Sequence, residues 1–502
     1  MLNILNLTKT NKLILAAFAF LAALTLGGGR AHAATLNVTG GCTLPIAIDS
    51  VNAGANQSDC TASGSYGTND TITLPAGTIT LSADLPEITK SVSISGAGMD
   101  QTTISGDNGS YTTIWAVVPY DDPIVNVSVQ DLKITAFNSK ALRMKNVNAT
   151  LRNIEVDGQD SNALDGIVAD PSTQVATSVL MENIYVHNMT AAGFVRVIAV
   201  NAEGGDIAVE ANLNNITIAD IHNTGAQNFT YGVQILAIGD SEVTATISNV
   251  TVDDITGEDF VAPFGSFSVG VDGASTSVNT SVNNITVTGM RGVTGTGFAA
   301  DIRSAAFYAA AAVDQPSGHA DVNVSVSNSL MADNLNNGVS SNCTAVDLTN
   351  AVGGSGTDVS FGITSNGFNM SDDDTCDMFI EEGDQQNISN IIPTLGPLQN
   401  NSGSVPTRAL LPGSPAIAAG ASVLGVTTDA RGIARPNSCP SVGAFQFEGA
   451  VCGASTPSTP GSGNAGAPNT GIGAVSPAIT IIATSLGLCF IVYALRKRSA
   501  LK

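Results

Sequence analysis

Short segments in which apolar and polar residues alternate recur through the middle of the chain. They share one pattern: asparagine or aspartate, an apolar residue, any residue, and an apolar residue. The copies are 131–134, 153–156, 183–186, 215–218, 249–252 and 284–287, with a weaker one at 328–331. Alternation with a period of two predicts strands with one buried face, and repetition at intervals of a few tens of residues predicts a repeat architecture.

Most copies follow a second alternating segment, such as 147–151, 243–247, 278–282 or 322–326. Two short strands per repeat cannot enclose a core alone, whereas stacked copies can. We therefore predict an all-β fold, a right-handed parallel β-helix, with asparagines stacked in a hydrogen-bonded ladder at its turns. A β-propeller is the alternative, but no Trp-Asp or kelch-type signature occurs, and the chain has a single tryptophan.

The β-helix makes a definite prediction about each repeat. The two apolar positions should point inward and the residue between them outward, because strand side chains alternate between faces. The inward rows are Ile154, Ile184, Ile216, Val250 and Ile285, and Val156, Val186, Ile218, Val252 and Val287; the outward row is Glu155, Tyr185, Thr217, Thr251 and Thr286.

The first 33 residues are typical of a secretory signal peptide. Lys9 and Lys12 precede a 14-residue apolar run, Leu13 to Leu26, and the segment closes in Ala31-His32-Ala33. We expect the chain to be exported, with cleavage after Ala33.

The other end predicts an anchor. Residues 475–495 carry no charge and are long enough to span a bilayer as one transmembrane helix, so the basic tail 496–502 should remain cytoplasmic. The preceding stretch, 453–466, is dominated by Gly, Ser, Thr, Pro and Ala, which predicts a flexible stalk over 453–471.

The stalk ends in the pentapeptide Ala467-Pro468-Asn469-Thr470-Gly471. Together with the apolar span and basic tail, it resembles the sorting signal of sortase-anchored wall proteins, whose usual pentapeptide is Leu-Pro-x-Thr-Gly. Ala467 stands where Leu is usual. The resemblance implies a sortase-like transpeptidase as a partner, cleavage between Thr470 and Gly471, and attachment to the cell wall.

Charge and cysteines agree with an extracellular setting. Without the basic residues of the signal peptide and tail, 12 basic residues face 42 acidic ones, a net charge near −30. Such a surface repels nucleic acid and anionic lipid. Six cysteines lie outside the membrane span, and an even number in an exported chain predicts disulfides. Other connectivities remain open, but pairing of sequence neighbours is expected: Cys42 with Cys60, Cys343 with Cys376, and Cys439 with Cys452.

Both flanks of the predicted ectodomain resemble known surface proteins. The run Cys42 to Ile48 is similar to the start of bacterial β-helix proteins bearing a Cys-Ser-Leu-Arg-Glu-Ala-Ile motif, and 411–420, 429–432 and 443–445 resemble the closing segment of choice-of-anchor Q proteins. The resemblance implies a pectin-lyase-like fold. We divide the ectodomain into a cap with the first coils (34–110), β-helix repeats (111–395) and a closing segment (396–452).

Carbohydrate chemistry on such a fold needs particular groups. A lyase requires carboxylates that hold Ca²⁺ beside an Arg or Lys base, and a hydrolase requires two carboxylates about 5 to 9.5 Å apart. The candidate set consists of Asp253, Asp254, Glu258 and Asp259 with Arg291 or Arg303. A solvated turn is the competing interpretation of these acids.

A second acidic set, Asp157, Asp160, Asn162 and Asp165, has oxygen ligands spaced as in a Ca²⁺-binding turn. No other cofactor is expected, and His187, His222 and His319 are too isolated in sequence to predict a metal site or triad. The favoured function is that of an envelope-anchored surface protein that displays an acidic β-helix for adhesion to, or binding of, a glycan, a host or a neighbouring cell. The alternative is a polysaccharide lyase or glycoside hydrolase.

Overall fold

The structure is a computed structural model that describes residues 33–452 except 110–111, 120–121, 160–161, 173–175, 226–227, 293–303, 350–353, 355 and 450–451. The predicted stalk, pentapeptide, membrane span and basic tail lie outside the described residues, as does the signal peptide up to residue 32. Within the described part, no helix is both long and apolar enough to cross a membrane.

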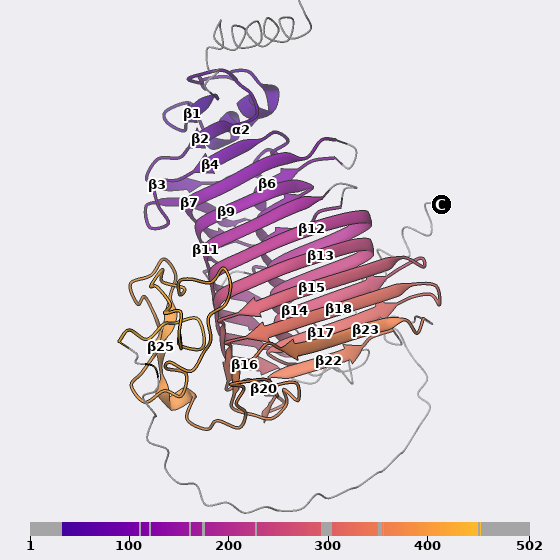
Figure 1. The fold of residues 1–502 in the computed structure, drawn as a ribbon. Coiled ribbons are helices and arrows are strands. Elements are labelled where there is room, and N and C mark those ends of the chain that lie inside the picture. The colour runs from indigo at the N-terminus through magenta and orange to yellow at the C-terminus, as the bar shows by residue number, and fades with distance from the viewer. Residues whose placement is uncertain are drawn as a thin grey trace, which may run out of the picture.

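The described chain is almost entirely β (Figure 1). One α-helix, α2 (Leu44–Ala53), and one short 3-10 helix, η2 (Ile392–Thr394), accompany the strands. In chain order the strands are β1 (Thr35–Asn37), β2 (Asp70–Thr73), β3 (Gly77–Thr80), β4 (Val92–Ser95), β5 (Thr102–Gly109), β6 (Thr112–Val117), β7 (Val125–Phe137), β8 (Lys140–Lys145), β9 (Val147–Asp157), β10 (Asp165–Ala169), β11 (Thr177–Ala191), β12 (Val195–Asn223), β13 (Thr230–Gly257), β14 (Val261–Gly270), β15 (Ser275–Asn283), β16 (Thr286–Gly292), β17 (Phe307–Val313), β18 (His319–Ser327), β19 (Leu330–Ala332), β20 (Leu335–Asn336), β21 (Val339–Ser340), β22 (Cys343–Asp347), β23 (Val359–Ser365), β24 (Met370–Ser371), β25 (Leu395–Gln399) and β26 (Thr407–Leu410).

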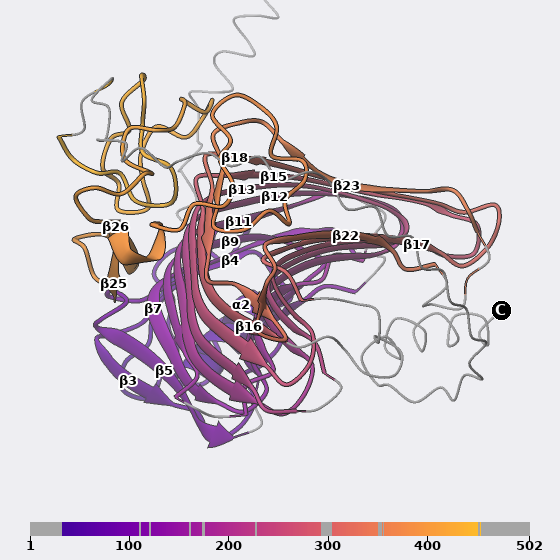
Figure 2. The same ribbon diagram turned by 90° about the horizontal axis from the view of Figure 1, so that it is seen from below.

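Each coil pairs with the coils before and after it, and the pairing is parallel. For example, β11 pairs with β9 on one side and with β12 on the other, and β13 pairs with β12, β14, β15 and β16. Among the named strands, only β20–β21 and β25–β26 are antiparallel. Stacked parallel coils are the predicted parallel β-helix and exclude the four-stranded antiparallel blades of a propeller. Figures 1 and 2 show the solenoid from two sides.

Every middle coil has three faces, which we name by their residues. The first face contains 147–152, 177–182, 207–214, 242–248, 275–283 and 319–327. The second face contains 154–157, 184–191, 216–223, 250–257 and 286–292. The third face contains 140–145, 165–169, 195–204, 230–239, 261–270, 307–313 and 343–347.

The asparagine of each repeat forms the bend between the first and second faces. Asn153, Asn183, Asn215 and Asn249 have φ of 51°, 57°, 55° and 56°, a left-handed conformation that asparagine tolerates better than most residues. Their side chains stack: the Nδ2 of Asn183 donates to the Oδ1 of Asn153 at 2.8 Å, and that of Asn215 donates to Asn183 at 3.1 Å. The predicted ladder is confirmed from Asn153 to Asn215 and ends at Asn249, whose Nδ2 donates to Asn214 Oδ1 at 3.1 Å instead.

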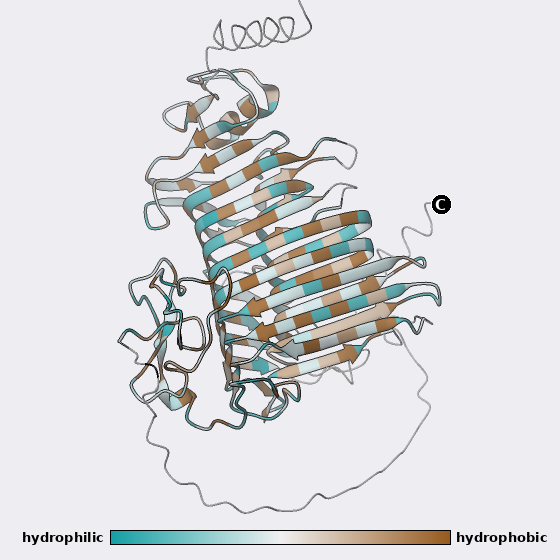
Figure 3. Ribbon diagram, in the orientation of Figure 1, coloured by the Kyte–Doolittle hydropathy of each residue, from teal (hydrophilic) through white to brown (hydrophobic). Residues whose placement is uncertain are grey.

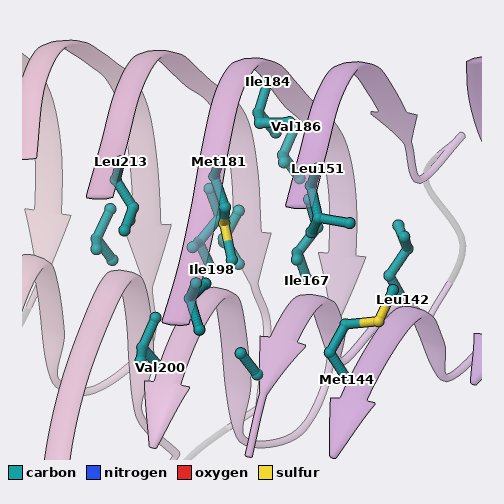
Figure 4. Packing of buried hydrophobic residues seen from close by; sticks show 14 of the residues in the cluster. Leu142, Met144, Leu151, Ile167, Met181, Ile184, Val186, Ile198, Val200 and Leu213 are labelled. Carbon is teal, nitrogen blue, oxygen red and sulfur yellow. The ribbon is translucent and has the colours of Figure 1, made fainter. Parts of the chain in front are cut away.

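The inward rows lie in the lumen as predicted. Ile154, Ile184, Ile216 and Val250 are in register on consecutive coils, and all are fully buried. Figure 3 shows the hydrophobic and hydrophilic residues alternating along the strands, and Figure 4 shows side chains of successive coils stacked inside. Leu151, Met181 and Leu213 form one such stack on the first face.

The predicted outward row is only partly exposed. Glu155 and Tyr185 are partly accessible, but Thr217, Thr251 and Thr286 are buried. They are covered because residues 396–449, which we call the C-terminal segment, fold back along the outside of the second face (Figure 2). Thr217 Oγ1 donates to the Pro406 carbonyl at 2.6 Å, and the Ala444 amide donates to Thr286 Oγ1 at 3.0 Å.

The three predicted disulfides are confirmed. The Cα atoms of Cys42 and Cys60 are 4.5 Å apart, those of Cys343 and Cys376 are 4.9 Å apart, and those of Cys439 and Cys452 are 5.7 Å apart. The first bond lies beside α2, whose Leu44, Ala47 and Ile48 belong to the main core. The third lies at the end of the C-terminal segment.

Candidate functional site

The predicted acidic set around Asp253 does not form a lyase-like cluster with Arg291. Arg291 Nη2 instead pairs with Asp333 Oδ2 at 2.7 Å, and none of the four acids has an ion pair with Arg291. Asp253 lies on the outside of the second face, where Arg408 of the C-terminal segment donates to its Oδ1 at 3.1 Å and Thr288 Oγ1 also donates to it. The surface around Asp253 is therefore occupied by the chain itself.

The remaining members of that set have separate places. Asp254 forms a bend with φ of 55°, and Glu258 is exposed in the following turn. Asp259 is buried, and burial raises the pKa of its carboxyl. Arg303 lies outside the described residues.

The predicted Ca²⁺ turn is also divided. Asp165 pairs with Arg196, whose Nη2 lies 2.8 Å from Oδ2, and with Lys140 at 3.2 Å. Asn162 Oδ1 accepts the Ala192 amide at 3.2 Å. Asp157 has other partners, described below, and Asp160 lies outside the described residues. Basic side chains therefore satisfy the carboxylates that were expected to share a cation.

The structure brings a different group of ionisable side chains together on the outer surface of the second face. Lys133 Nζ lies 2.9 Å from Glu155 Oε1 and 2.8 Å from Asp157 Oδ2. His187 Nε2 lies 3.0 Å from the same Glu155 oxygen. The ring of Tyr185 stacks on His187 with 4.0 Å between centroids. We call these five residues the Lys133 site.

Parallel register places these residues next to one another. Lys133, Glu155 and Tyr185 are partners on three successive coils, and so are Thr135, Asp157 and His187. Residues two apart on a strand share a face, and adjacent coils are about 4.8 Å apart. Two short rows therefore form a compact group from residues as far apart in sequence as 133 and 187.

The site is rigid and still reachable. The side chains of Lys133 and Glu155 are 24% and 21% exposed, and those of Asp157 and His187 are 11% and 10% exposed. Asp157 Oδ1 also accepts hydrogen bonds from Asn188 Nδ2 and the Gln159 amide, both at 3.1 Å. These bonds orient the Asp157 carboxylate.

Mutual pairing keeps the charged forms of these groups. Burial alone would raise the pKa of Glu155, but hydrogen bonds from His187 and Lys133 outweigh it and hold the pKa below its ordinary value. Burial alone would also raise the pKa of Asp157, but hydrogen bonds from Lys133 and Asn188 outweigh it, and the pKa is lowered. The pKa of Lys133 is raised, because its bonds to Asp157 and Glu155 outweigh burial. The site thus holds one ammonium and two carboxylates.

Glu155, Asp157 and His187 also place three potential metal-ligating atoms within 4.8 Å of one another. A histidine nitrogen and two carboxylates suit a divalent transition metal. However, the Lys133 ammonium lies between the two carboxylates, so the position is already neutralised by a cation of the protein itself.

The C-terminal segment forms one wall of the site. Tyr185 packs against Val405, Ala430 and Ala444 of that segment. On the neighbouring coil, Asp220 lies at a bend within the second face, with φ of 54°. Burial, followed by the nearby charge of Asp254, raises the pKa of Asp220. The site therefore lies in the angle between a flat sheet and a docked segment.

Reasoning from the sequence recognised only parts of this site. The sequence pattern predicts a Ca²⁺ turn at Asp157 and leaves His187 isolated. The signal was present in the repeats: aligning the Asn-apolar-x-apolar units puts Lys133, Glu155 and Tyr185 at one outward position, and Asp157 and His187 two residues later at another.

No protein-family model matches the sequence, and no curated protein matches it either. Among solved structures, the chain is similar to the A-module of mannuronan C-5 epimerase AlgE6 from Azotobacter vinelandii. The match covers 59% of this chain and 90% of that one, with 14% identity and a TM-score of 0.22. At that score the similarity carries no argument, and the β-helix assignment rests on the strand pairing described above.

Proposed function

We propose that this protein is a surface protein that binds a neutral, hydroxyl-rich glycan at the Lys133 site. The observation that carries the proposal is the group of Lys133, Glu155, Asp157 and His187, fixed on adjacent coils, partly exposed and bordered by the C-terminal segment. Structural ion pairs alone would explain the contacts. They do not explain why this polar group coincides with the edge of a docked segment.

The chemistry of the group fits sugar hydroxyls. Carboxylate oxygens have more acceptor positions than Lys133 and His187 occupy, and the ammonium can donate three hydrogen bonds. The proposed ligand is neutral because an ectodomain with a net charge near −30 repels polyanions. Rigid coils also reduce the entropy that ordering the site would cost on binding.

The pKa directions favour binding over catalysis by these residues. A glycosidase needs one carboxyl that is protonated near neutral pH, whereas the pKa values of Glu155 and Asp157 are both lowered. A lyase base must be neutral, whereas the pKa of Lys133 is raised.

One observation favours glycoside hydrolysis as a second candidate. Asp220, with its raised pKa, lies two coils from Asp157, with its lowered pKa. Two coils correspond to ~10 Å, near the carboxylate separation of inverting glycosidases. Divergent pKa values in one place are typical of an acid and base pair.

Binding and hydrolysis can be tested together. The ectodomain is applied to a glycan array and, in parallel, incubated with the polysaccharides it retains while reducing ends are measured. Lys133→Met should reduce retention at least ~10-fold, because the remaining carboxylates repel each other and lose their fixed geometry. Arg152→Met removes a cation of similar length from an exposed pair with Glu182 on the first face and should leave retention unchanged.

The two candidates predict different results. Equal retention by both variants would refute the binding site, and release of reducing ends that Asp220→Asn abolishes would replace binding with hydrolysis.

We also propose that the chain is exported and anchored in the envelope, as the signal peptide, pentapeptide, apolar span and basic tail suggest. Mass spectrometry of the protein from its native envelope should find a C-terminus at Thr470 joined to a wall fragment. An intact C-terminal span that detergent alone extracts would instead make this a single-pass membrane protein.

A further inference from the structure

The third face has apolar side chains on both of its sides in its middle coils. Residues of one parity, such as Val233, Phe264 and Phe307, belong to the main core. Residues of the other parity form a separate cluster that points away from the lumen, because strand side chains alternate. We call this cluster the outer aromatic surface: Phe229, Tyr231, Leu236, Ile238, Phe260, Ala262, Phe267, Val269, Val271, Tyr308, Ala310 and Ala312.

This surface is continuous and crosses several coils. Tyr231 contacts Phe267 edge-on with 5.2 Å between ring centroids, and Phe267 contacts Tyr308 at 5.6 Å. Phe260 meets Tyr308 edge-on at 4.8 Å. On the first face of the same coils, the outward residues are polar instead, for example Glu242, Thr244 and Thr246. The outer side of the third face is therefore apolar and aromatic where that of the first face is polar.

The members of the surface are all buried. Each is at most 9% exposed. These residues lie on the third face and in the turns that enter and leave it. The Tyr308 hydroxyl is buried and has no hydrogen-bond partner among the described residues. An unpaired buried hydroxyl is unfavourable, which points to an occupant that brings a polar atom.

We propose that the outer aromatic surface docks residues 475–495 of the same chain. This segment has no charge over 21 residues and includes the hydroxyls of Thr480, Thr484 and Ser485. As a helix it would be ~30 Å long. The five coils of β12, β13, β14, β17 and β22 span about 19 Å, so the segment is long enough to cover them.

The connection to the described chain permits this docking. Residues 453–474 separate Cys452 from the segment, and an extended chain of that length reaches ~70 Å, which suffices to pass around the solenoid. Ala483 and Gly487, four residues apart, would allow a helix to approach the sheet closely. A hydroxyl of the segment would satisfy Tyr308.

The docked state belongs to the uncut chain outside a membrane. Insertion of 475–495 into a bilayer, or removal of the segment by cleavage after Thr470, would leave the outer aromatic surface free. The surface would thus keep the segment soluble until it is inserted or removed. This inference is independent of the Lys133 site, which lies on a different face.

A cysteine within residues 475–495 can report docking by forming a disulfide with a cysteine placed on the outer aromatic surface. Cys489 lies within 475–495, and the other six cysteines are paired. Three single variants, Ala262→Cys, Ala310→Cys and Ala312→Cys, place a small thiol on the outer aromatic surface. Thr244→Cys, exposed on the first face, is the matched control. The uncut full chain, purified without lipid or detergent, is oxidised mildly and digested, and its disulfide-linked peptides are quantified by mass spectrometry.

At least one third-face variant should link to Cys489 within the same molecule at least ~10-fold faster than Thr244→Cys, because docking raises the effective concentration of the thiol. Cys489→Ser should abolish the link. Vesicles without anionic lipid should reduce the link, because residues 475–495 can insert into their bilayer instead of docking. Equal linking at third-face and control positions would overturn the proposal. Links between two molecules would also overturn it and assign the surface to a second copy.

Discussion

Arg435 should be the main attachment of the C-terminal segment to the β-helix. Its guanidinium is buried and donates to the carbonyls of Thr428, Ser441 and Gly443 at 3.2, 3.0 and 2.8 Å. It also donates to Asn249 Oδ1 at 3.0 Å. Asn249 belongs to the bend of the solenoid, so one side chain organises the segment and joins it to a coil. Burial lowers the pKa of Arg435 to about 10, which leaves it protonated at neutral pH.

Arg435→Met keeps an unbranched side chain up to the fourth position and removes every side-chain donor. Thr428 O retains Asn249 Nδ2 as a donor at 3.0 Å, whereas Ser441 O, Gly443 O and Asn249 Oδ1 lose the bonds described. A buried acceptor left unpaired costs about 1–3 kcal/mol. Because water can enter at the border of the segment, we expect a total loss of about 3–5 kcal/mol. Arg435→Lys should give an intermediate loss, since an ammonium cannot reproduce the planar fork.

Hydrogen exchange measures the effect locally. A loss of this size should accelerate amide exchange in residues 396–449 by roughly 10²- to 5 × 10³-fold, while strands β11 to β13 keep their protection. Arg152→Met, in the exposed first-face pair, is the control and should change neither region. An unchanged rate in the segment, or an equal acceleration in the coils, would refute the role assigned to Arg435.

Three further predictions concern the coils. Asn183→Ala removes two ladder hydrogen bonds and forces alanine to a φ of 57°. It should lower the free energy of unfolding, measured in urea, by about 2–4 kcal/mol. Asn183→Gly should lower it less, and equal losses would contradict the conformational argument. Glu155 and Asp157 have lowered pKa values in the folded state. The stabilisation that they provide is therefore present above the unfolded pKa values near 4 and is lost as the pH falls through the folded values. The stability difference between wild type and a Glu155→Gln, Asp157→Asn double variant should shrink on acidification, and a constant difference would refute this prediction. Replacing Cys343 and Cys376 by alanine opens a loop of 33 residues and should lower thermal stability by about 3–4 kcal/mol on chain-entropy grounds; an unchanged Tm would show that the loop is restrained by other contacts.

The coils were predictable because two independent signals coincide in each repeat. In 153–156, alternation identifies the buried Ile154 and Val156, and Asn153 marks the bend that separates this strand from the preceding one. Both signals are local, so variable spacing between repeats did not hide them. The disulfide pairs were predictable for a similar reason, since each closes a short loop.

The docking of the C-terminal segment was not predictable in the same way. Its contacts join residues far apart in sequence, such as Thr217 with Pro406 and Thr286 with Ala444. Threonine at the middle position of a repeat is typical of a solvated strand face, and nothing in the alternation distinguishes a solvated threonine from one covered by another segment. The Lys133 site was not predictable for a related reason, because its two rows are recognisable only when repeats of unequal length are placed in register.

The outward rows of the second face, once placed in register, indicate where the C-terminal segment covers the sheet. One row runs Lys133, Glu155, Tyr185, Thr217, Thr251 and Thr286, and the next runs Thr135, Asp157, His187, Ala219, Asp253 and Thr288. The first row changes from charged or aromatic residues to threonine at β12, where the C-terminal segment covers Thr217. The second row retains Asp253 beneath that segment, where Arg408 pairs with it. Small side chains let a segment approach the backbone closely, whereas large ionisable groups remain where the surface is open. A change of composition along one register row therefore marks the boundary of a docked segment, and it places the Lys133 site at that boundary.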